Sequence, residues 1–250
     1  MTPRVVLGID LGAESGRVMA GRWDGSRLEV EEIHRFPNGP LELAGSLRWN
    51  VGRLWEEIRV GLGRAAARGG ERPAAVGVDT WGLDYALLSA SGELLGLPFC
   101  YRDARTRGRL AEALGRVPRE ELFAATGSQF LEINTLYQWM AHLQTSPEVW
   151  AAASTFLMMP DWVNWCLSGE RVAEFTNATT TQFLDPRSRD WARPLLGRLG
   201  LPTSCLPPVV APGTVLGPVR PGLGGGAGLG GAVVIAPATH DTASAVAAVP

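Results

Sequence analysis

Three short polar segments of the chain could carry chemistry, and each follows an apolar run typical of a buried strand. The first segment joins an aspartate, a tight turn and an arginine, and its residues are Asp10, Gly12, Ala13, Glu14, Ser15, Gly16 and Arg17. Turn amides and a serine hydroxyl can donate hydrogen bonds to phosphate oxygens, arginine can bind them in a bidentate manner, and aspartate can hold a hydrated Mg²⁺. An ordinary β-hairpin also uses Asp and Gly in its turn, so this segment alone leaves both interpretations open.

The second segment lies at the end of the apolar run at 74–80 and offers Asp79, Thr80, Trp81, Gly82 and Asp84. Carboxylates can hydrogen-bond sugar hydroxyls, an aromatic ring can form an apolar wall, and glycine lets a ligand approach the backbone. The pattern therefore predicts a polyol-binding edge. A corner between two strands, with Trp81 in the core, explains the same residues.

The third segment, Thr239, His240, Asp241 and Thr242, directly follows the apolar run at 232–236. Asp241 could act as a base toward a bound substrate, and His240 could hydrogen-bond a sugar hydroxyl. Helix capping by Asp241 or Thr242, with His240 as an interior residue, is the alternative.

Composition excludes several classes of protein. The chain has 250 residues, 46% of them hydrophobic, which is too apolar for intrinsic disorder. Its 23 basic and 25 acidic side chains give a net charge of −2, so nothing favours nucleic-acid binding. All the basic residues are arginines, which excludes a P-loop lysine or a Schiff-base lysine within this sequence.

Location is also constrained by the sequence. No apolar run approaches the ~20 residues that cross a bilayer. The first residues enter a strand pattern directly, without the features of an export signal. The three cysteines, Cys100, Cys166 and Cys205, form no C-x-x-C pair. We therefore expect reduced thiols and a cytoplasmic protein with no membrane partner.

The elements that must position these segments predict an α/β or mixed α+β fold. Alternating apolar residues and short glycine-containing turns predict an antiparallel meander of strands at 4–10, 17–23 and 28–36. Apolar runs at 74–80 and 232–236 predict buried strands, and 85–89 predicts a further antiparallel strand after the turn at Trp81 and Gly82.

Helical patterns fall into two regions. Asn50 is a good N-cap for a helix whose apolar face carries Val51, Leu54, Trp55, Ile58 and Leu62. Residues 102–169 are predicted to be helical, with Thr135 and Gln138 forming a capping box and Gly169 ending a helix over about 161–167.

Taken in order, the three segments resemble the FGGY family of carbohydrate kinases. The similar stretches span residues 10 to 250 and include DLGAESGRVMAGR, GVDTWGLDYALL, TNATTTQ and THDTASAV. The resemblance implies a ribonuclease-H-like domain of the actin and Hsp70 type, with a mixed β-sheet flanked by helices. It implies transfer of the γ-phosphate of ATP to a sugar. DTWGLD is most similar to members that phosphorylate the 1-hydroxyl of L-rhamnulose.

The same resemblance implies a role for particular residues. Ala13, Glu14, Ser15, Gly16 and Arg17 correspond to the loop that binds the ATP phosphates, and Asp10 to the acid that holds Mg²⁺, through water. The backbone of Gly82 corresponds to a sugar contact, and so do His240, Asp241 and Thr242, with Asp241 as the proton acceptor. Glu14 departs from the family pattern, which often has Ser there, but its backbone amide can still serve.

The resemblance also implies a second domain. Residues 1–237 would form the N-terminal sugar-binding domain and 238–250 the start of a nucleotide-binding domain that is otherwise missing, so we expect this chain alone to have little or no turnover. Two alternatives stay open. One is an FGGY kinase for L-fuculose, xylulose or glycerol, and the other is a sugar-binding module without catalysis.

Overall fold

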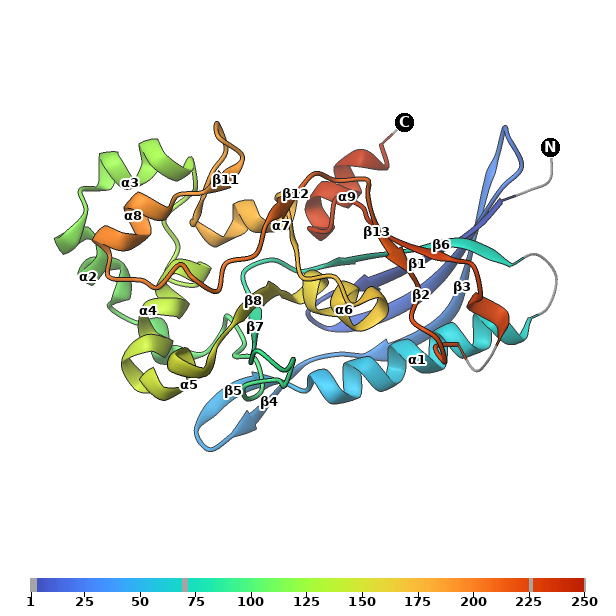
Figure 1. Ribbon diagram of the computed structural model, residues 1–250, viewed down its shortest axis with the longest axis horizontal. Helices are drawn as coiled ribbons and strands as arrows, with labels where there is room; N and C mark the ends of the chain where they lie inside the picture. The colour runs from blue at the N-terminus through green and yellow to red at the C-terminus, as the bar shows by residue number, and fades with distance from the viewer. Residues whose placement is uncertain (1–3, 69–71, 225–226, 250) are drawn as a thin grey trace.

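The centre of the protein is a six-stranded mixed β-sheet (Figure 1). The computed structural model describes residues 4–68, 72–224 and 227–249. From one edge to the other, the strands are β13 (Thr214–Pro218), β14 (Val233–Ala236), β6 (Pro73–Thr80), β1 (Arg4–Leu11), β2 (Ser15–Trp23) and β3 (Leu28–Pro37). β1, β6 and β14 run parallel, and the other neighbours pair antiparallel. The predicted meander and both predicted buried strands are confirmed.

Helix α1 (Val51–Ala67) packs on β2 and β3. The Asn50 side chain accepts a hydrogen bond from the Arg53 N–H, so the predicted N-cap is confirmed. Val51, Leu54, Ile58 and Leu62 are buried and share a hydrophobic core with the alternate residues of the sheet. Helix α6 (Met159–Ser168) covers β6, β13 and β14, and it ends at Gly169, whose φ of +95° suits glycine.

A helical region gathers at one end of the sheet and has its own hydrophobic core (Figure 1). Its elements are η1 (Ala104–Thr106), α2 (Arg109–Arg116), α3 (Arg119–Thr126), α4 (Thr135–Thr145), α5 (Pro147–Ala152) and α8 (Arg193–Arg198). Trp139 stands at the centre of this core, with ring centroids 4.5 Å from Trp150 and 5.0 Å from Phe156. This core anchors one side of the candidate site described below.

Short elements complete the structure. The strand pairs are β4 (Pro40–Leu43) with β5 (Ser46–Trp49), β7 (Tyr85–Leu88) with β8 (Thr155–Met158), β9 (Ala173–Glu174) with β12 (Val209–Val210), and β10 (Leu184–Asp185) with β11 (Asp190–Trp191). The short helices are α7 (Phe175–Ala178), η2 (Thr179–Thr181), η3 (Ala227–Leu229) and α9 (Asp241–Ala247). No helix within the described ranges is long and apolar enough to span a bilayer.

Two local predictions are wrong. The antiparallel strand predicted at 85–89 is confirmed as β7, but the prediction of helix throughout 102–169 is wrong, because the partner strand β8 lies in that region. Thr135 and Gln138 form no capping box, because Thr135 is already the first residue of α4 and both side chains bond to the distant corner at residues 83–84. In both cases a partner far away in the sequence outcompetes the local pattern.

The contact between α1 and β2 predicts a sharp contrast between two glycines of the same helix. A Cβ atom on Gly61 would lie 2.8 Å from Val18 Cβ, whereas one on Gly63 would meet nothing within 4 Å. We expect Gly61→Ala to lower the free energy of unfolding by about 1–3 kcal/mol through overpacking. Gly63→Ala should raise it by about 0.5–1 kcal/mol through helix propensity. Urea denaturation measures both, and a stabilising Gly61→Ala would contradict this packing.

Candidate active site

The three polar segments meet at one edge of the sheet, where the parallel strands end. Asp10 on β1 lies in register with Arg17 on β2 and with Asp79 on β6. Just beyond β14, the Thr239 carbonyl accepts a hydrogen bond of 2.9 Å from the Thr80 N–H, and Thr80 and His240 form a parallel β-bridge. Residues from near both ends of the chain therefore lie at the same edge of the sheet.

The turn between β1 and β2 is held from two directions. The Gly12 N–H donates to the Ser15 carbonyl at 2.8 Å, which closes the turn. Asn38 donates from its side chain to the Gly12 carbonyl at 2.7 Å and from its backbone to the Glu14 carbonyl at 3.0 Å. The carbonyls are therefore occupied, while the N–H groups of Ala13 and Glu14 have no partner in the part of the chain that the structure describes. Such a turn can bind an anion.

Charge at this turn is balanced by one short ion pair. Arg17 Nη2 lies 3.3 Å from Asp10 Oδ2, and each side chain is 36% exposed. Arg17 Nε is buried without a hydrogen-bond partner among the described residues. The Glu14 side chain is exposed. Because the Arg17 side chain is partly exposed, its guanidinium can still donate to a phosphate, and the exposed carboxylate of Glu14 does not block the turn.

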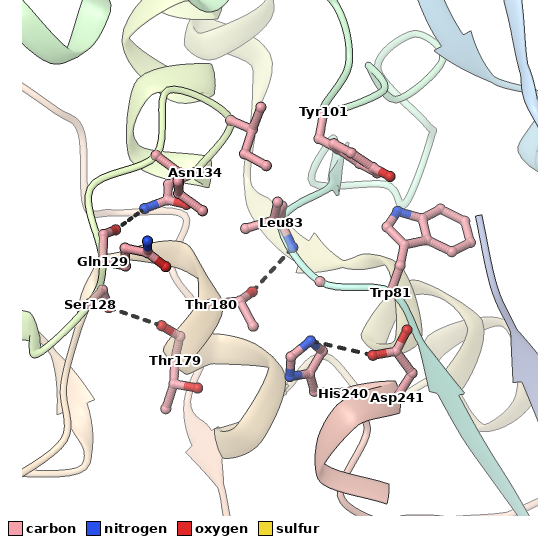
Figure 2. Close-up of a pocket in the computed structure, with 13 residues that line it drawn as sticks. Trp81, Leu83, Tyr101, Ser128, Gln129, Asn134, Thr179, Thr180, His240 and Asp241 are labelled. Atoms are coloured by element: carbon pink, nitrogen blue, oxygen red, sulfur yellow. Dashed lines mark hydrogen bonds and ion pairs between the residues drawn. The ribbon is translucent and has the colours of Figure 1, made fainter. Parts of the chain in front are cut away.

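A cavity of about 530 Å³ opens beside these segments (Figure 2). It is lined by Trp81, Gly82, Leu83, Tyr101, Ser128, Gln129, Leu131, Ile133, Asn134, Thr179, Thr180, His240 and Asp241. Asp241 and His240 lie on the side of Trp81, with His240 Nε2 3.5 Å from Asp241 Oδ1, whereas Ser128 and Gln129 lie on the opposite side. A small polar ligand with one apolar face suits this lining.

Three of the predicted sugar contacts, Gly82, His240 and Asp241, line this cavity, and the fourth does not. The exposed Thr242 instead donates from its hydroxyl to Asp241 Oδ1 at 3.0 Å. Helix α9 begins at Asp241, with His240 in the N-cap position and no side-chain cap. The capping alternative for Asp241 is therefore not observed, and Thr242 contacts the carboxylate that borders the cavity.

Asp84 does not face the cavity, so the prediction that it contributes to a polyol-binding edge is wrong. It is fully buried, and burial raises its pKa from 3.8 to about 6 despite its hydrogen bonds. Its carboxylate accepts hydrogen bonds from Trp49 Nε1 at 2.6 Å, Trp81 Nε1 at 3.0 Å, Gln138 Nε2 at 2.9 Å and the Tyr101 N–H at 3.1 Å. Asp84 thus orients two walls of the cavity, and Trp81 is both a core residue and a cavity wall.

The corner that follows β6 is constrained from several sides. Leu83 has a φ of +79°, a backbone conformation that residues other than glycine rarely adopt. Its N–H donates to Thr180 Oγ1 at 3.1 Å, and its carbonyl accepts from Thr135 Oγ1 at 2.6 Å. A Cβ on Gly82 would lie 2.9 Å from Thr180 Cγ2, so only glycine fits there without displacing the threonine. Gly82 therefore borders the cavity with backbone atoms alone.

The sequence did not predict the cavity residues that lie outside the three polar segments. Tyr101, Ser128, Gln129, Thr179 and Thr180 line the cavity, yet none of them follows a predicted strand. All five lie in stretches that resemble the family, but no chemical pattern within these stretches singles out their positions. Only the fold brings them to the sheet edge.

Asp79 experiences the charges of both distant segments. It is partly buried, and its pKa is raised from 3.8 to about 7, first by burial and then by repulsion from Asp10 and Asp241, while Arg17 lowers it. Carboxylates repel one another in this way only at short range or in a poorly solvated site. The carboxylate of Asp79 is therefore repelled both by Asp10, next to the 10–17 turn, and by Asp241.

Comparisons with known proteins match nearly the whole chain. Residues 5–248 match the model of the N-terminal domain of the FGGY family of carbohydrate kinases. A rhamnulokinase of Oceanobacillus iheyensis is 39% identical over 244 residues, which cover 98% of this chain and 52% of that protein. The chain thus spans about half the length of this relative.

Solved structures show the same fold. The xylulose kinase of Rhodospirillum rubrum superposes with a TM-score of 0.84 at 26% identity, covering 98% of this chain and 50% of that one. The glycerol kinase of Plasmodium falciparum, solved with ADP, gives a TM-score of 0.83 at 15% identity, covering 97% and 49%. The expectation of a ribonuclease-H-like domain with a mixed sheet flanked by helices is confirmed.

The electrostatic position of Asp79 can be tested by ¹³C NMR titration of its carboxyl carbon without divalent cations. We expect a midpoint near 7 that falls in both Asp10→Asn and Asp241→Asn, because each change removes a neighbouring negative charge. The midpoint should stay above 3.8, since burial remains. Arg17→Gln is the control of opposite sign and should raise it. A midpoint that none of these changes moves would contradict the convergence of the three carboxylates.

Proposed function

Because this chain belongs to the FGGY family of carbohydrate kinases, we propose that it is the sugar-binding part of an ATP-dependent kinase for L-rhamnulose. The products are L-rhamnulose 1-phosphate and ADP, in L-rhamnose catabolism. The main support is the convergence of Asp241, the 10–17 turn and a sugar-sized cavity at one sheet edge. The 39% identity with a rhamnulokinase supports the choice of sugar.

In the proposed mechanism, Asp241 accepts the proton of the 1-hydroxyl while that oxygen attacks the γ-phosphorus of ATP. Phosphoryl transfer passes through a loose transition state, so a carboxylate of ordinary basicity suffices when it is well positioned. His240 and the backbone of Gly82 orient the sugar, and Thr242 hydrogen-bonds the base. Alignment of the two reactants then contributes most of the rate enhancement.

The turn supplies the groups that hold the phosphates. The unpartnered N–H groups of Ala13 and Glu14, with Ser15, Gly16 and Arg17, donate to phosphate oxygens. No group of three or more His, Cys, Asp or Glu side chains within the described ranges is arranged to ligate a metal directly. The partly exposed carboxylate of Asp10 therefore suits a hydrated Mg²⁺ held through water. The ion neutralises phosphate charge when bound.

The apolar lining of the cavity supports a deoxy sugar. Leu83, Leu131 and Ile133 all border the cavity, and Leu131 is 42% exposed even though it is apolar. L-Rhamnulose ends in a methyl group, which gains from contact with such side chains, whereas xylulose and glycerol have none. L-Fuculose shares the methyl group and is the strongest competing substrate.

We also propose the domain division and the location expected from the sequence. Residues 1–237 form the sugar-binding domain, and 238–250 begin a nucleotide-binding domain. The exposure of α9, which contains no buried residue, supports assigning the last residues of the chain to a second domain. The unbonded state of Cys100, Cys166 and Cys205 supports a cytoplasmic location.

Kinase assays on the full-length protein test the proposal. We expect kcat/KM for L-rhamnulose to exceed that for xylulose and glycerol by about 100-fold or more, with L-fuculose intermediate. Asp241→Asn should lower kcat by roughly 10²–10⁴-fold, because it removes the base, and should leave sugar affinity within a few fold. Full activity of this variant would eliminate Asp241 as the base. Sugar binding without turnover by the wild type would instead identify a non-catalytic sugar-binding module.

A further inference from the structure

Glu174 is a fully buried carboxylate that takes no part in the reaction proposed above. It ends β9 and immediately precedes α7. Its Oε2 atom accepts hydrogen bonds from the Thr239 N–H at 3.0 Å, the Thr239 hydroxyl at 2.8 Å and the Thr176 hydroxyl at 2.6 Å. The N–H groups of Thr176 and Asn177 donate to the same carboxylate at 2.9 and 3.3 Å.

These bonds join two walls of the cavity. On one side, Glu174 caps α7, which continues through η2 to Thr180. On the other side, Thr239 directly precedes His240 and Asp241 in the sequence. His240 and Asp241 line the cavity (Figure 2). Two longer hydrogen bonds join the same two segments. The His240 N–H donates to the Thr176 hydroxyl, and Asn177 Nδ2 donates to the Thr239 carbonyl, each at 3.3 Å.

The chemistry of the contact requires a carboxylate. All five groups around Glu174 donate, and an ionised carboxylate only accepts. A glutamine in its place would direct its amide N–H₂ toward at least one of these donors. The Glu174 N–H itself donates to Asp161 Oδ1 at 3.0 Å, which fixes the backbone from behind. The carboxylate therefore has one well-defined place between the two segments.

We propose that Glu174 is a positioning residue that sets the distance between the Thr180 wall and the Asp241 carboxylate. This inference rests on the proposed function, because its consequence is the alignment of the sugar hydroxyl with its base. Neither Glu174 nor Thr239 lines the cavity, so their effect reaches the sugar only through His240, Asp241 and Thr180. Displacement of a reacting group by about 1 Å can cost about 100-fold in rate.

The test compares Glu174→Gln, Thr239→Val and Thr239→Ser in the full-length protein. Valine has the shape of threonine without the hydroxyl donor, whereas serine keeps the donor and loses only the methyl group. Three quantities are measured well below the unfolding temperature: kcat and KM for L-rhamnulose, sugar binding by tryptophan fluorescence, and amide hydrogen exchange at Thr239 and His240. Exchange at residues of β1 and β2 is the internal control.

We expect Glu174→Gln and Thr239→Val to lower kcat by roughly 10–100-fold in fully folded protein, with a smaller change in KM. Exchange at Thr239 and His240 should accelerate at least about tenfold, with β1 and β2 unchanged, and Thr239→Ser should stay close to wild type. If Glu174→Gln does not fold, the two Thr239 variants decide the matter. A purely structural role predicts a lower unfolding temperature with normal kcat per folded molecule.

Three results would overturn the inference. They are unchanged exchange at Thr239 and His240 in Glu174→Gln and Thr239→Val, normal kcat per folded molecule in these two variants, or Thr239→Ser as impaired as Thr239→Val. Failure of the proposed function looks different, because wild-type protein would then turn over no sugar. In that case, faster exchange together with weaker sugar binding in Glu174→Gln would still support the positioning role, and unchanged values of both would reject it.

Discussion

The parallel pairing of β6 with β1 on one side and β14 on the other is the constraint on which the candidate site depends. Parallel strands end at the same edge of a sheet, so this pairing brings Asp10, Asp79 and the 239–241 segment together although they are far apart in the sequence. The register also matters, because a slip of one residue would turn Asp79 to the opposite face. The pairing and register of these strands therefore determine which side chains meet at the edge of the sheet.

Two buried carboxylates connect this edge to the rest of the molecule. Asp84 joins Trp49 and Trp81 of the sheet core to Gln138 of the helical region, and Glu174 joins the α7 segment to Thr239. Burying a carboxylate is costly unless donors surround it, and both have at least four. Because each network spans two segments of the cavity wall, loss of one donor would leave a buried carboxylate partly unsatisfied and disturb that wall.

The sequence predicted what depends on local pattern and missed what depends on distant partners. Strands β1, β2, β3, β6 and β14 and the N-cap at Asn50 follow from alternation, apolar runs and capping chemistry. The pairing of β7 with β8, the role of Gln138 and the buried position of Asp84 could not be predicted, because their partners lie on other elements. The cavity residues of the 128–134 and 179–180 segments were missed for the same reason, since no pattern links them to the sheet edge.

The most direct test is a crystal structure of this protein with L-rhamnulose bound. If the carboxylate of Asp241 faces the 10–17 turn with a sugar between them, the sugar will lie in the cavity between Trp81 and Thr180. One of its hydroxyls should then lie about 2.6–3.2 Å from an Asp241 oxygen and point toward the turn. A sugar bound outside this cavity, or an Asp241 carboxylate turned away from it, would contradict this arrangement.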